Sequence, residues 1–230
     1  MTEQMTPREE LTLLRPAPRR MLADEVYEIL RESLISQRIP PGARLNLDRL
    51  ARELHVSNTP VRQALSRLEA DGLVQKEPYV GFTASPLLDS RTIEQLYDLR
   101  LLIEPTNAER AASAVAREGV DELTAICVGA DALLAESSAE HAEALGAADM
   151  EFHVSIARSA GNDVITAHLH EVLTQMSRYT LYTSDDAAHL AWAEHRTILD
   201  AIDASDSGAA TEAMRQHLRR GLHRVQDLVN

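Results

Sequence analysis

Four side chains in the second half of this sequence, Asp149, His153, His195 and His217, could converge on a metal ion. Asp149 and His153 are four residues apart, which places a carboxylate and an imidazole on one face of a helix. His195 and His217 each lie beside the apolar face of a later helical stretch. One carboxylate and three imidazoles can hold Zn²⁺, Ni²⁺, Mn²⁺ or Fe²⁺. Because interior histidines held by hydrogen bonds are commoner than such sites, the spacing by itself leaves both interpretations open.

Six helical stretches must position these residues. Their apolar periodicity and the breakers between them predict helices at 89–117, 120–137, 139–159, 162–182, 184–203 and 209–229. Asn162 can cap the fourth helix, and Pro105 predicts a kink in the first. The candidate ligands then lie on the third, fifth and sixth helices. Helices of this length and number predict an all-α antiparallel bundle.

A different motif lies between residues 47 and 74. Apolar residues at i, i+3, i+4 and i+7 from Leu47 form one face of a first helix. Ser57 or Thr59 can cap a second helix, whose first turn accommodates Pro60. Two short helices with a tight turn form either an ordinary hairpin or a helix-turn-helix, whose second helix enters the major groove. Its candidate DNA contacts are Ser57, Asn58, Thr59, Arg62 and Arg67.

The flanking segments favour the DNA-binding interpretation. Residues 21–36 predict a further helix with an apolar face, and residues 73–76 and 81–84 predict two strands joined by breakers. The helix supplies the core that a small helix-turn-helix needs, and the hairpin is a wing. We therefore expect a mostly α protein, with an N-terminal winged helix-turn-helix followed by the six-helix bundle.

The N-terminal segment resembles the winged helix of GntR-family transcriptional regulators over residues 21–86. The resemblance is carried by Pro41-Gly42, Leu50-Ala51, Val56-Ser57, Thr59-Pro60-Val61-Arg62, Ala64-Leu65, Arg67-Leu68-Glu69 and Asp71-Gly72-Leu73-Val74. It implies a dimeric repressor or activator whose C-terminal domain senses a small metabolite. Asn58 and Val80 stand where the family usually has arginine, and Leu47 where it usually has an acidic residue. The two lost cations imply fewer phosphate or guanine contacts.

Residues 89–230 carry a second resemblance. The run from Asp149 to His153, then 159–162, Glu194-His195 and His217 resembles the FCD ligand-binding domain of the FadR subfamily in its six-helix, VanR-like variant. This resemblance implies that Asp149 and the three histidines bind a divalent metal that faces an effector pocket.

Arg100 occupies the place of an arginine that is characteristic of the first FCD helix. The resemblance implies that its guanidinium and the metal together accept a small carboxylate effector. A surface salt bridge or an intrahelical pair with Glu104 is the alternative. Arg178 and Tyr179, on the fourth expected helix, are further candidates for effector binding.

Charge is distributed unevenly along the 230 residues. The formal net charge is −13, yet residues 1–85 carry equal numbers of acidic and basic side chains, so the whole excess lies in the remainder. The second part is therefore not expected to contact nucleic acid. Single Cys127 excludes an internal disulfide, and neither a signal peptide nor an apolar run of membrane-spanning length is present. We expect a cytoplasmic protein without a membrane partner.

These patterns predict three parts: a flexible arm at 1–20, a DNA-binding domain at 21–86, and a ligand-binding, dimer-associated domain at 87–230. The expected function is a homodimeric regulator that reads an imperfect palindrome in double-stranded DNA and is controlled by a small organic acid, with repression as the expected sign. The protein is not expected to be an enzyme, because it has no H-E-x-x-H, Walker or nucleophile-elbow motif. Two alternatives remain: a metal-dependent enzyme for small carboxylic acids with a vestigial DNA-binding domain, and a pure metal sensor.

Overall fold

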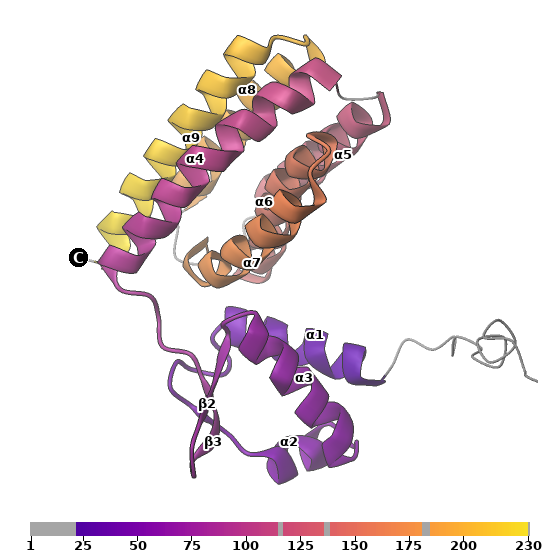
Figure 1. Ribbon diagram of the computed structural model, residues 1–230, viewed down its shortest axis with the longest axis vertical. Helices are drawn as coiled ribbons and strands as arrows, with labels where there is room; N and C mark the ends of the chain where they lie inside the picture. The colour runs from indigo at the N-terminus through magenta and orange to yellow at the C-terminus, as the bar shows by residue number, and fades with distance from the viewer. Residues whose placement is uncertain (1–21, 115–116, 136–138, 181–184, 230) are drawn as a thin grey trace, which may run out of the picture.

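The computed structural model describes residues 22–114, 117–135, 139–180 and 185–229. Within these ranges lie nine helices and a small three-stranded sheet, so the protein is mostly α, as predicted (Figure 1). Helices α1 to α3 and the sheet form a smaller N-terminal part, and helices α4 to α9 form a bundle. No helix in the described ranges is long and apolar enough to cross a membrane.

The N-terminal part is organised around helix α3. Helices α1 (Leu22–Ile35), α2 (Leu47–Glu53) and α3 (Asn58–Ala70) bury a common core that includes Val26 and Leu30 of α1 and Leu65 of α3. The predicted helix-turn-helix is therefore confirmed as α2 and α3. Ser57 occupies the N-cap position of α3, but its side chain forms no capping hydrogen bond, and Thr59 lies inside the helix. The predicted N-cap position of Ser57 is therefore confirmed, but the predicted capping hydrogen bond of a hydroxyl is not formed.

The predicted wing is present as strands β2 (Val74–Glu77) and β3 (Gly81–Ala84), which pair antiparallel. Strand β1 (Arg44–Leu45) pairs with the other edge of β3 and was not predicted. Two residues are too few for the alternation of apolar and polar positions to be recognised in a sequence.

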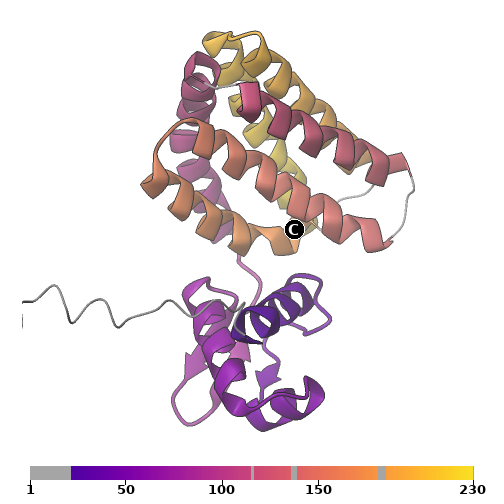
Figure 2. The ribbon, with the colours of Figure 1, turned by 90° about the vertical axis from the view of Figure 1, so that its right-hand side faces the viewer.

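Six helices form the bundle: α4 (Ser90–Ala114), α5 (Arg117–Ala135), α6 (Ala139–Ser159), α7 (Asp163–Thr180), α8 (Asp185–Asp203) and α9 (Ser207–Val229). Helix α4 runs along α9, and α6 lies between α5 and α7 (Figure 1). Figure 2 shows the bundle from the side, above the N-terminal part. Asn162 caps α7 as predicted, because its Oδ1 accepts a hydrogen bond from the backbone N–H of Ile165 at 3.1 Å.

The buried face of α4 is not purely apolar. Leu99, an apolar residue of this helix, is 40% exposed. Arg100 and Glu104 instead occupy buried positions on this helix, at 5% and 1% exposure. An apolar pattern could not reveal this face, because two of its positions carry charged side chains. The helix continues through Pro105 to Ala114.

The N-terminal part contacts the bundle at α6 and α7. Nη2 of Arg31, on α1, lies 3.7 Å from Sδ of Met150, on α6. Gly72 has a φ of +75° after the end of α3, and a Cβ added there would lie 3.2 Å from the side chain of Gln175 on α7. The winged helix thus contacts the helix that carries Asp149.

Candidate metal centre

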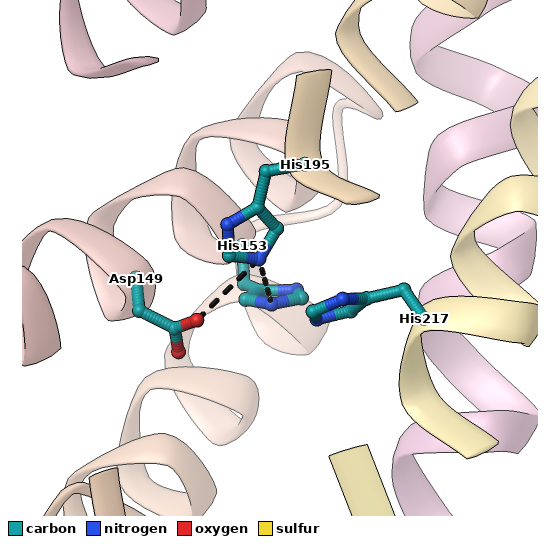
Figure 3. A group of neighbouring side chains, drawn as sticks. All are labelled: Asp149, His153, His195 and His217. Carbon is teal, nitrogen blue, oxygen red and sulfur yellow. Dashed lines mark hydrogen bonds and ion pairs between the residues drawn. The ribbon is translucent and has the colours of Figure 1, made fainter. Parts of the chain in front are cut away.

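The four candidate ligands converge inside the bundle. Asp149 and His153 come from α6, His195 from α8 and His217 from α9, and one ligand atom from each lies within 4.8 Å of the others (Figure 3). The three histidines are at most 5% exposed, whereas Asp149 is partly exposed. Residues separated by as many as 68 positions in the sequence therefore form one cluster.

The distances between these atoms suit a shared cation. Nε2 of His195 lies 3.3 Å from Nε2 of His153 and 3.4 Å from Oδ1 of Asp149 (Figure 3). Two ligand atoms that are each about 2.1 Å from one ion lie about 3.0 Å apart at a right angle and about 3.4 Å apart at the tetrahedral angle. The cluster therefore has the dimensions and the nitrogen and oxygen donors of a site for a divalent transition metal.

A buried carboxylate lies behind His153. Oε2 of Glu104 is 2.5 Å from Nδ1 of His153, and Oε1 accepts a hydrogen bond from Nε of Arg100 at 2.5 Å. The carboxylate thus favours the tautomer in which Nδ1 carries the proton and Nε2 of His153 is unprotonated, the form in which Nε2 can bind an ion.

His217 has a similar arrangement behind it. Its Nδ1 lies 2.9 Å from Oε2 of Glu194, and Arg224 donates hydrogen bonds to both oxygens of that carboxylate, at 3.0 and 2.9 Å. Glu194 directly precedes His195 on α8, so the two side chains point about 100° apart around the helix. That angle directs Glu194 toward α9, where it reaches His217, so its role depends on helix packing that the sequence pattern does not contain.

The protonation states of the cluster suit metal binding. Burial alone would raise the pKa of Glu104, but Arg100 and His153 lower it to about 2. Burial would also raise the pKa of Glu194, which hydrogen bonds from His217 and Arg224 lower to about 2. Burial lowers the pKa of His195 well below its usual range. A neutral imidazole at His195 and ionised carboxylates at Glu104 and Glu194 are the protonation states that metal binding at this cluster requires.

Arg100 lies inside this site and not on the surface. Besides its ion pair with Glu104, its Nη2 lies 3.3 Å from Nε2 of His153. Both interpretations of Arg100 from the sequence thus describe part of its environment: it forms the intrahelical pair, and its guanidinium borders the candidate ligands. Arg178 and Tyr179 lie on the last turn of α7, and their side chains are outside the described ones.

Asn107 is a polar residue that the sequence interpretation did not select. It lies on the same face of α4 as Arg100 and Glu104, at spacings of seven and three residues. Its side chain is 1% exposed, and neither its amide oxygen nor its nitrogen has a hydrogen-bond partner among the described residues. A buried amide without partners is uncommon and marks a place where a ligand or water can bind.

The candidate DNA contacts have different environments on α3. Arg62 is exposed and forms no ion pair within the described part of the chain. Arg67 pairs with Asp24 at 2.5 Å, and its Cζ lies 4.1 Å from the centre of the Tyr27 ring. Asn58 donates a hydrogen bond to Asp48. Arg62 is thus available to contact DNA, whereas Arg67 links α3 to α1 through its contacts with Asp24 and Tyr27.

The fold is that of a winged helix-turn-helix protein with a C-terminal helical bundle. Residues 22–83 match the model of bacterial regulatory proteins of the gntR family, and residues 95–220 match the FCD domain. The chain therefore belongs to the GntR family of transcriptional regulators and carries an FCD domain.

Individual relatives and a solved structure agree with this assignment. An uncharacterised HTH-type transcriptional regulator of Streptomyces ambofaciens is 30% identical over 85% of this chain and 81% of its own length. A probable D-xylose utilization operon transcriptional repressor of Paenarthrobacter nicotinovorans is 25% identical over 87% of each chain. The structure of E. coli McbR/YncC shares the fold with a TM-score of 0.78, at 18% identity over 92% of this chain and 100% of that one. Both relatives are named as transcriptional regulators, which speaks against the enzymatic alternative.

Proposed function

We propose that this regulator holds a divalent metal ion at Asp149, His153, His195 and His217, and that a small organic acid binds beside the ion and changes operator binding. The convergence of these four side chains is the observation that carries the proposal. Zn²⁺, Ni²⁺, Mn²⁺ and Fe²⁺ all suit the three imidazoles and one carboxylate. When bound, the ion supplies a positive centre that attracts an anion.

The protein's own residues give the effector its chemistry. Arg100 presents a guanidinium next to His153, where it can donate hydrogen bonds to a carboxylate. Asn107 offers both a donor and an acceptor to a second polar group of the same molecule. A small acid with a hydroxyl or carbonyl group therefore fits these residues best. Arg178 and Tyr179 remain candidates for binding the same acid.

The contact between α6 and α1 supports a route from the sensor to the DNA. Asp149 would hold the ion, and Met150, the next residue on α6, contacts Arg31 of the DNA-binding part. A movement of α6 on ligand binding would shift this contact and therefore the position of the winged helix. Such a ligand acts by binding one arrangement better than the other.

We propose residues 21–86 as the DNA-binding domain and 87–230 as the ligand-binding and dimer-associated domain. A homodimer would present two recognition helices to the half-sites of an imperfect palindrome. Repression that the acid relieves is the proposed sign, in line with the name of the Paenarthrobacter relative.

A mobility-shift titration tests this function. The full-length protein is titrated onto the DNA upstream of its own gene, with and without a chelator and a panel of small carboxylates. We expect a shifted band at low salt whose midpoint changes with at least one acid, and only when the metal is present. A pure metal sensor would respond to the ion and to no acid, and the absence of any shifted band would contradict operator binding.

A further inference from the structure

The recognition helix begins with an asparagine that an aspartate holds in place. Nδ2 of Asn58, the first residue of α3, donates a hydrogen bond to Oδ1 of Asp48 on α2 at 2.7 Å. Both side chains are exposed. The N-terminal residues of a recognition helix are those that contact base edges in the major groove. The pair therefore lies where the protein would read sequence.

The aspartate determines what the asparagine can offer to DNA. An ionised carboxylate only accepts hydrogen bonds, so Asp48 must face the amide nitrogen of Asn58 and not its oxygen. One of the two N–H groups of that nitrogen is used by Asp48. Asn58 is left with one acceptor, Oδ1, and one donor, its second N–H group.

This combination matches one base in the major groove. Adenine presents a donor at N6 and an acceptor at N7, and asparagine can bind both. Guanine presents two acceptors, O6 and N7, so its O6 would face the amide oxygen of Asn58 and the negative charge of Asp48. Thymine presents an acceptor and a methyl group, and cytosine only a donor.

We propose that Asp48 and Asn58 act as one unit that selects adenine at one position of each operator half-site. Asn58 is the residue that contacts the base, and Asp48 is a positioning residue that fixes its amide. Arg62 lies one turn further along the same face of α3, and arginine most often pairs with guanine. The unit and Arg62 would therefore read neighbouring base pairs with different hydrogen-bonding patterns, adenine with one donor and one acceptor and guanine with two acceptors.

Selection from a random double-stranded DNA library by the full-length protein tests this proposal. We expect the wild type to enrich a motif in which one position per half-site prefers adenine over guanine by roughly five- to 150-fold, the discrimination of a good bidentate pair. Asn58→Arg should change that position to guanine and leave the rest of the motif unchanged. Asp48→Ala should lower the adenine-to-guanine ratio at the same position only.

Two further variants separate base reading from general damage. Arg62→Ala should alter a different position of the motif, and Glu69→Ala, on the exposed last turn of α3, should leave the motif unchanged. Thermal melting establishes that each variant is folded. The proposal is overturned if Asn58→Ala selects the wild-type motif, or if Asp48→Ala keeps the full adenine preference.

Discussion

Nδ1 of His217 lies 2.9 Å from Oε2 of Glu194, so the residue that precedes one candidate ligand on α8 supports another candidate ligand on α9. Oε2 of Glu104, on α4, likewise lies beside Nδ1 of His153, on α6. Each glutamate is in turn paired with an arginine, Arg100 or Arg224. The site thus has two layers, an inner one of candidate ligands and an outer one that orients two of them.

Removal of Glu194 should weaken metal binding without removing a ligand. Partners behind a ligating histidine commonly contribute roughly 10- to 100-fold in metal affinity, so we expect a loss of this size in Glu194→Ala. Competition with a chelator of known affinity measures it. Glu212→Ala, an exposed glutamate on α9, is the matched control and should bind as the wild type does. Equal affinities for both variants would exclude an orienting role for Glu194.

Replacement of Arg100 by lysine should separate the acid from the metal. Arg100→Lys keeps a positive charge beside Glu104 but loses the planar fork that binds a carboxylate through two hydrogen bonds. We expect normal metal content and at least a roughly tenfold loss in affinity for the acid that stabilises the wild type. Thermal shifts across a panel of small carboxylates provide the comparison. An unchanged response in the variant would place the acid elsewhere.

Without the acid, we expect the wild-type protein to be less stable than a variant in which an apolar side chain replaces Asn107. A buried polar group without a hydrogen-bond partner costs about 1–3 kcal/mol, so Asn107→Leu should raise the free energy of unfolding by about that amount. The same variant should lose part of the stabilisation that the acid gives. Urea unfolding with and without the acid measures both effects. A variant less stable than the wild type would mean that water or protein already satisfies the amide.

Arg62 and Arg67 should have separable roles although both lie on α3. Arg62→Ala should lower operator affinity by about 1–3 kcal/mol, the contribution of a specific base contact, and leave the melting temperature unchanged. Arg67→Ala should lower the free energy of unfolding by about 1 kcal/mol, because it loses an exposed ion pair with Asp24 and a contact with Tyr27. Titrations of operator DNA and thermal melting compare the two. The reverse pattern would assign DNA contact to Arg67.

The helices could be predicted because they depend on local spacing, and the cluster could be predicted because its four residues match the family pattern. Asp149 and His153 share a face wherever their helix lies, and Asn162 caps α7 through a contact three residues away. The parts that were missed depend on tertiary packing. Leu99 is exposed because Arg100 and Glu104 occupy the buried face of α4. Glu194 reaches His217 because α8 packs against α9.

Metal analysis of the purified protein tests the central claim most directly. We expect about one equivalent of a divalent transition metal per wild-type chain, since the four converging side chains form a single site. Asp149→Ala and His195→Ala should each lose most of it, while His189→Ala, an exposed histidine on the same helix as His195, should retain it. Unchanged metal content in folded Asp149→Ala and His195→Ala proteins, or a wild type that takes up no metal when supplied with these ions, would contradict the account.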